Sequence, residues 1–285
     1  MAFISDVKKD MDFYKDLSEL LKVLKGIAIS QFYAFEKKVY SFEKFSYVVE
    51  GFLGGINLKN ISHPFINPTT DIVGVIAVTS DAGLLGGLNV QVINTAFKEL
   101  SEKRGRIIVV GERGRIYVRE RGINCVYMEG IKEDYIFEQA QALRNHIIKE
   151  VIKGNMGEVK IVYPHAYSLA VQRVEVESLL PYGKSGREKK HIDIYGFIWE
   201  SPVERVVEYL IYLWMIKRIY EIFMTSKLSE FAARFMHLED CTRKIEELDE
   251  KLRYKYFRLR HELTDRSMRE LFAAKMIFDR KLKSK

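Results

Sequence analysis

The chain has 285 residues, of which 47% are hydrophobic and 30% are charged, as in ordinary globular proteins. An aromatic content of 12% argues against disorder, and two cysteines in unrelated surroundings, Cys125 and Cys241, exclude a disulfide framework. The net charge is +7, and residues 252–285 hold eleven Lys or Arg against four acids. This basic segment indicates binding to nucleic acid, to an anionic membrane surface or to an acidic protein, or simply a solvated face.

Proline and glycine divide the chain into three parts. All five prolines lie between residues 64 and 202, no glycine follows Gly196, and only Gly26 precedes residue 51. Because these two residue types are the strongest helix breakers, both ends are free to form long helices. We therefore predict an N-terminal helical segment over 1–60, a central α/β domain over 65–200 and a C-terminal helix over 203–285.

The N-terminal segment carries apolar residues at helical spacing, and such a stripe must be buried against a partner. Its members are Val7, Met11, Tyr14, Leu17, Leu21, Leu24 and Ala28, followed less regularly by Phe32, Phe35, Val39, Phe42 and Phe45. The early aspartates Asp6, Asp10, Asp12 and Asp16 argue against a targeting peptide, and no apolar run reaches the roughly 18 residues of a membrane span.

The central part alternates strands and helices, which predicts a mainly parallel sheet. The predicted strands are 72–79, 106–110 and 159–163, the last ended by Pro164, with further strands in 168–180 and 191–199; the predicted helices are 89–103 and 135–153.

A glycine-rich turn, formed by Asp81, Gly83, Gly86, Gly87 and Asn89, follows the first predicted strand and precedes a helix. That is the place for a phosphate-binding loop. A Walker A loop requires a lysine, however, and none occurs between Lys59 and Lys98. We therefore interpret these residues as a tight structural turn.

The C-terminal helix begins with favourable signals, because Ser201 fits an N-cap, Pro202 the first helical position and Glu204 the first turn. A continuous helix of residues 203–285 would be about 120 Å long at ~1.5 Å per residue. Its apolar stripe consists of Ile245, Leu248, Leu252, Tyr256, Leu259 and Leu263. The predicted fold is thus an antiparallel coiled coil of the two terminal helices plus a small α/β domain.

Chemical motifs are few. No Ser/His/Asp or Cys/His arrangement and no metal-ligand spacing is visible, so no catalytic, cofactor or metal residue is predicted. Basic and aromatic residues interleave in 253–258, a pattern that fits base stacking but more often packs a pair of helices.

Several blocks together resemble the gamma subunits of rotary ATP synthases. Residues 80–89 are similar to the family's Ser-Asp-x-Gly-Leu-Cys-Gly-Gly-x-Asn signature, with Leu85 at the cysteine position. Residues 229–236 are similar to its Ser-Glu-x-Ala-Ala-Arg-Met block, and residues 6–9 and 24–30 to two blocks of its first helix. The resemblance extends over essentially the whole chain.

The resemblance implies a non-catalytic rotor shaft, present in one copy per complex, which couples rotation of a membrane c-ring to ATP synthesis or hydrolysis. The implied partners are the alpha and beta subunits, the epsilon subunit and the c-ring. It implies that ATP, ADP and magnesium bind to alpha and beta, that this chain holds no cofactor, and that it binds no nucleic acid. It also implies a peripheral location on the cytoplasmic face of the bacterial inner membrane.

The implied contacts with partner subunits lie on both terminal helices, at Leu24, Lys25, Ile27, Arg234, Met236, Arg253, Tyr256, Arg258, Arg260 and His261. The chain departs from the family's usual residues at Glu19, Gln31, Lys244, Phe257, His261 and 264–267. The alternatives are the rotor of a specialised F-type-like ATPase, a nucleic-acid-binding coiled-coil protein, and an enzyme with a ligand site in the α/β domain.

Overall fold

The computed structural model describes residues 2–283 except 40–42, 59–60, 102–104 and 184–199, and it divides into two compact units. Residues 1–27 and 238–285 form the helix-pair unit, and residues 28–237 form the sheet unit. Helices α1 (Ala2–Val39) and α6 (Val203–Lys283) each contribute to both units. The predicted boundaries at 60 and 203 follow breaker residues, whereas the compact units follow contacts between residues.

Within the helix-pair unit, α1 and α6 run antiparallel. Lys22 pairs with Glu246 at 2.8 Å and Lys25 pairs with Glu239, so residue numbers rise along one helix as they fall along the other. This orientation confirms the predicted antiparallel pairing of the terminal helices. The segment predicted as N-terminal helix, 1–60, holds α1 and also α2 (Glu43–Gly55), which belongs to the sheet unit.

The buried positions of the helix pair alternate in steps of four and three, the spacing of a coiled-coil seam. On α1 the seam contains Val7, Met11, Tyr14, Ser18 and Leu21, and on α6 it contains Leu238, Thr242, Ile245, Asp249, Leu252, Tyr256 and Leu259. We expected Leu248 and Leu263 in this stripe, and that was wrong, because both side chains are exposed. The four-three repeat places Asp249 in the seam instead of its neighbour Leu248.

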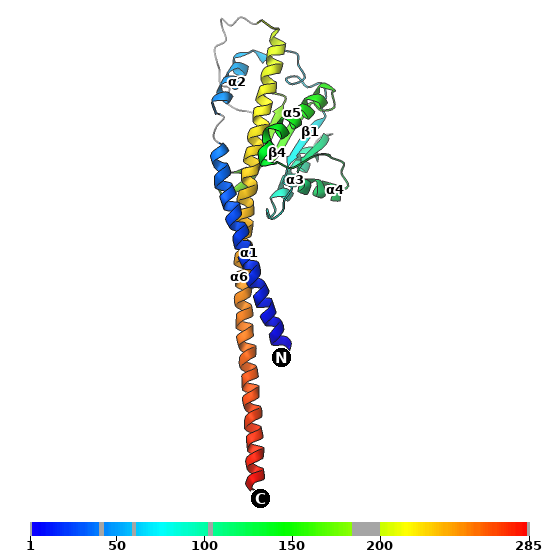
Figure 1. Ribbon diagram of the computed structural model, residues 1–285. Helices are drawn as coiled ribbons and strands as arrows, with labels where there is room; N and C mark the ends of the chain where they lie inside the picture. The colour runs from blue at the N-terminus through cyan, green and yellow to red at the C-terminus, as the bar shows by residue number, and fades with distance from the viewer. Residues whose placement is uncertain (1, 40–42, 59–60, 102–104, 184–199, 284–285) are drawn as a thin grey trace. The chain divides into compact units, whose positions relative to one another are not determined.

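The sheet unit is built on five strands in the order β3-β2-β1-β4-β5. The central strand β1 (Val73–Val78) is buried throughout and pairs in parallel with β2 (Gly105–Val110) and β4 (Glu158–Ala166). Strand β3 (Val126–Met128) adds a parallel edge, and β5 (Gln172–Leu180) adds an antiparallel one. The predicted mainly parallel sheet is confirmed (Figure 1).

Helices cover both faces of this sheet, because successive strand residues point to opposite sides. Val75 and Val109 pack with α3 (Leu88–Ser101) and α4 (Glu112–Glu120) on one face. Ile76 and Ile108 pack on the other face with α5 (Ile136–Ile152), α2 and α6. A short 3-10 turn, η2 (Glu133–Tyr135), leads into α5. The larger core therefore lies between the sheet and α6.

Two strand predictions change. Strand β4 continues through Pro164 to Ala166, whereas we predicted an end at Pro164. Its parallel pairing with β1 stops at Val162, and beyond it only β5 is a neighbour, with Pro164 opposite Val174. A proline without an N–H is tolerated where one side of the strand needs no hydrogen bond. The predicted strand at 191–199 lies outside the described residues.

Candidate interaction surfaces

The three predicted contact residues of α1 differ in their surroundings. Leu24 and Lys25 are half-buried at the edge of the helix pair, and Lys25 is held by its ion pair with Glu239. Ile27 points into solvent with half of its surface exposed. Of these three residues, Ile27 thus offers the most apolar surface for a partner.

Ile27 belongs to an apolar surface on α1 that our sequence reasoning missed. Phe13, Leu20, Val23 and Ile27 are 50% to 64% exposed, and they are spaced by seven, three and four residues. At about 100° per residue, this outer stripe lies on the side of α1 opposite the seam. The spacing was visible in the sequence, but the seam residues have the same periodicity, so only the structure separates the two stripes.

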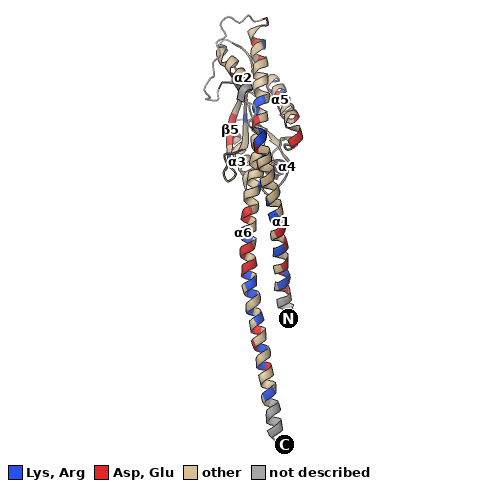
Figure 2. Cartoon of the chain, turned by 60° about the vertical axis from the view of Figure 1, so that its left-hand side comes forward, with Lys and Arg blue, Asp and Glu red and all other residues tan. Residues whose placement is uncertain are grey.

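The predicted contact residues of the distal α6 are mostly exposed. Arg253 bonds to Asp249 at 2.9 Å and Arg258 to Glu262 at 3.1 Å, each pair within one turn of the helix. Tyr256 is half-buried in the seam, whereas Arg260 and His261 are exposed. Figure 2 shows basic and acidic residues mixed along this part of α6. Its positive charge is therefore partly neutralised within the helix.

Residues 264–276 of α6 are exposed without exception. The large apolar side chains Met268, Leu271, Phe272 and Met276 are each at least half exposed. Arg266 pairs with Glu270 at 3.0 Å on the same helix. An exposed apolar surface of this extent marks a site of contact with another molecule.

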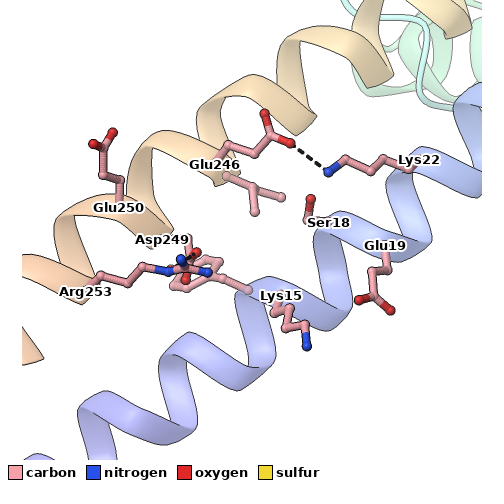
Figure 3. Close-up of a pocket in the computed structure, with 10 residues that line it drawn as sticks. Lys15, Ser18, Glu19, Lys22, Glu246, Asp249, Glu250 and Arg253 are labelled. Atoms are coloured by element: carbon pink, nitrogen blue, oxygen red, sulfur yellow. Dashed lines mark ion pairs between the residues drawn. The ribbon is translucent and has the colours of Figure 1, made fainter.

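A cavity of about 500 Å³ interrupts the seam of the helix pair (Figure 3). Ser18 of α1 and Asp249 of α6 line it, where a coiled coil normally places two large apolar residues. The Lys22–Glu246 ion pair lies beside it, and the hydrogen bond from Lys22 lowers the pKa of Glu246. That pair therefore contributes stability above the usual carboxyl pKa, and the contribution is lost as the pH falls through the lowered value.

Filling this cavity should stabilise the helix pair. We expect Ser18→Leu to raise its free energy of unfolding by about 1 kcal/mol, because the new side chain buries apolar surface in the seam. Urea unfolding followed by circular dichroism measures the change. Glu19→Leu, at the exposed neighbouring position, is the control and should give no such gain. A lower stability of Ser18→Leu would contradict a loosely packed seam.

Two further predicted contact residues, Arg234 and Met236, belong to the sheet unit. Both are half-buried on α6, and Arg234 donates to Glu230 at 2.6 Å. Glu230 also accepts from Lys227 at 3.0 Å. Arg234 is therefore held in place by its own helix, with part of its surface open.

The glycine-rich turn joins three loops at the carboxyl end of the sheet. The Asp81 carboxylate accepts hydrogen bonds from the backbone N–H of Glu112 at 2.8 Å and of Gly130 at 3.1 Å. Asn89 donates to the Ser80 hydroxyl at 2.9 Å and accepts from its backbone N–H at 3.2 Å. The carboxylate of Asp81 thus takes up backbone donors at the edge where doubly wound sheets bind ligands.

The other residues of the turn fix its path. Gly86 has a φ of 59°, and a β-carbon there would lie 3.8 Å from the His237 ring of α6. A β-carbon on Gly83 would lie 3.2 Å from the Arg113 guanidinium, and one on Gly87 3.8 Å from Gln91. Leu85 packs against Ala233 of α6. The turn therefore connects the sheet to α6.

Among the described residues, no group of three or more His, Cys, Asp or Glu side chains is placed to hold a metal ion. In the same part of the chain, no helix combines the length and the apolar character needed to cross a membrane.

Comparisons with known proteins agree with the geometry. A family model described as ATP synthase matches residues 4–273. The ATP synthase gamma chain of Bdellovibrio bacteriovorus is 24% identical over 277 residues, which cover 92% of this chain and 94% of that protein. The gamma chain of Clostridium botulinum strain Loch Maree is 30% identical over 198 residues, which cover 68% of each chain.

Solved structures show the same fold. A chain of the Euglena gracilis mitochondrial ATP synthase, in a structure titled OSCP/F1/c-ring, aligns with a TM-score of 0.65 at 17% identity, covering 97% of this chain and 95% of that one. A chain from the central stalk and c-ring of the Tetrahymena thermophila enzyme gives 0.59 at 18% identity, covering 78% and 99%. With a family match over nearly the whole length and relatives that share both terminal helices and the sheet, the chain belongs to the ATP synthase gamma chain family.

Proposed function

We propose that this chain is the central rotor shaft of an ion-translocating ATP synthase and carries no catalytic group of its own. The observation that supports this most directly is the distal α6, where residues 264–276 are fully exposed and rich in apolar side chains. A long helix with such a surface is expected to be enclosed by other subunits. In the family to which the chain belongs, that enclosure is the ring of alpha and beta subunits.

The proposed ring contacts are the outer stripe of α1 together with the exposed residues of α6. Phe13, Leu20, Val23 and Ile27 supply apolar surface, and Arg258, Arg260 and His261 supply polar contacts. Arg234 and Met236 are proposed as a second contact, and Leu24, Lys25, Arg253 and Tyr256 as residues that shape the contact from the seam. Differences in contact energy around the shaft would convert its angle into different nucleotide affinities in the ring.

The sheet unit is proposed to contact the epsilon subunit and the c-ring. The titles of two similar structures name a c-ring together with the rotor, which supports this assignment by analogy. ATP, ADP and magnesium are then proposed to bind the alpha and beta subunits, and no cofactor is assigned to this chain. We place the complex at the cytoplasmic face of a bacterial membrane, with this chain peripheral and present once.

Reconstitution with the alpha and beta subunits tests the proposal. We expect a hexamer that contains one copy of this chain, and a bead attached to the sheet unit should rotate when ATP is added. A hexamer that hydrolyses ATP without turning the bead would overturn the rotor assignment.

The outer stripe of α1 can be tested in the same assay. Val23→Asp places a charge in an apolar contact, so we expect about a tenfold loss of affinity for the ring, which corresponds to ~1.4 kcal/mol. Because Val23 is exposed, thermal unfolding of the isolated chain should stay unchanged. Val23→Leu, which keeps the surface apolar, is the matched control. Equal affinity of both variants would remove the stripe from the interface.

A further inference from the structure

Two adjacent cations of α6 are buried in the sheet unit. The side chain of Lys217 is 7% exposed and that of Arg218 is 16% exposed. Burying a charge is costly unless it is paired, so a helix that buries two in succession must hold partners for both. Those partners come from different elements of the fold.

Lys217 reaches toward α2. Its Nζ lies 3.5 Å from Glu50 of α2 and 3.1 Å from Glu221 of α6. Around this pair, Val49 and Leu53 of α2 belong to the same apolar core as α6. The ion pair therefore marks one defined position of α2 on an otherwise apolar surface.

Arg218 reaches toward the antiparallel edge of the sheet. Its Nε donates to both carboxylate oxygens of Glu177 on β5, at 2.7 and 3.0 Å, and Nη1 donates to Glu221 at 3.0 Å. Its Nη2 lies 3.4 Å from the Tyr163 hydroxyl of β4, which itself donates to Glu175 at 2.9 Å. Burial works against the charge, yet the hydrogen bonds to Glu177 hold the pKa of Arg218 above its usual value.

The two side chains fix two directions around one axis. Consecutive residues of an α-helix point about 100° apart, so Lys217 and Arg218 hold α2 and β5 at different angles around α6. Apolar packing resists separation but has no direction, so it permits a helix to slip against its neighbours. A forked arginine–carboxylate pair is directional, and breaking it leaves an unpaired buried charge.

We propose that Lys217 and Arg218 are positioning residues that fix the angle of the sheet and of α2 around α6. Together with Glu50, Glu177 and Glu221 they form an ionic joint. The inference rests on the proposed rotor function: turning force that enters through the strands must pass to α6, and the joint is where directional contacts resist slippage between them.

The test uses the complete ATP synthase, reconstituted into lipid vesicles. The variant Arg218→Met/Glu177→Met replaces the pair by apolar side chains of similar size, a change that buried ion pairs commonly tolerate without loss of folding. We expect the same amount of assembled complex and the same rate of ATP hydrolysis. The membrane potential reached at that rate should fall by about threefold, on the scale on which residues of a coupling network act.

Two further variants sharpen the experiment. Arg218→Lys keeps the charge but loses the fork, so it should assemble normally and still lower the potential. Glu112→Met/Arg115→Met removes an ion pair that lies within α4 alone, and the potential should not change. If both Arg218 variants reach the wild-type potential, the ionic joint has no part in transmission. If the wild-type complex hydrolyses ATP but builds no potential, the rotor function itself is overturned.

Discussion

Replacing Phe231 with alanine should lower the free energy of unfolding of the sheet unit by about 3–5 kcal/mol, the largest loss that we expect from one substitution. Phe231 of α6 is 1% exposed and meets the ring of Phe35 on α1 edge to face, with the ring centroids 5.8 Å apart. Removing the ring leaves a cavity bordered by two helices that are also held by other contacts. The surroundings therefore cannot close over it.

Urea unfolding followed by circular dichroism measures this loss. Phe13→Ala is the matched control, because Phe13 is exposed on the outer stripe of α1 and its removal should change stability by less than about 0.5 kcal/mol. The two variants remove the same side chain from different surroundings. A loss below about 1 kcal/mol for Phe231→Ala would show that the contact between α1 and α6 in the sheet unit is not tightly packed.

Gly157→Ala should be almost as damaging, with an expected loss of about 3 kcal/mol. A β-carbon at this position would lie 1.8 Å from the backbone oxygen of Thr70. The obstacle is backbone and not a flexible side chain, and the Gly157 N–H is bound to the Ile72 oxygen at 2.8 Å. Relieving the overlap would displace the segment that leads into the central strand β1.

The control for this substitution is Gly26→Ala on α1. Nothing lies within 4 Å of a β-carbon at Gly26, so alanine should stabilise the helix by about 1 kcal/mol through its higher helix propensity. Both changes add one methyl group in place of a hydrogen. Equal effects of the two, read from thermal unfolding, would contradict the close approach of the chain at Gly157.

The sequence predicted the elements of this fold well where local signals are strong. The β-branched run of β1, the breaker-free stretch of α6 and the glycine turn each specify their structure within a few residues. Strand β3 escaped prediction because its three residues are paired on one side only and have no burial pattern of their own. Pro164 misled us because a proline ends a strand only where its missing N–H is needed.

Side-chain surroundings were predictable only in part. Apolar residues of α1 repeat at three and four positions on two sides of the helix, so periodicity alone could not tell the seam from the outer stripe. The seam of α6 includes Asp249, which no hydrophobic pattern would select. Lys217 and Arg218 look like solvated charges in the sequence, because their partners on α2 and β5 are brought near only by the folded sheet unit.

The alternating four-three spacing of the seam also has a mechanical consequence. A repeat of 3.5 residues is slightly shorter than the natural period of the α-helix, and it winds the two helices into a left-handed supercoil. Torsion in the sense that tightens this winding presses the seam together, whereas torsion in the other sense draws it apart. The helix-pair unit is thus a spring with two stiffnesses, one for each direction in which it is turned.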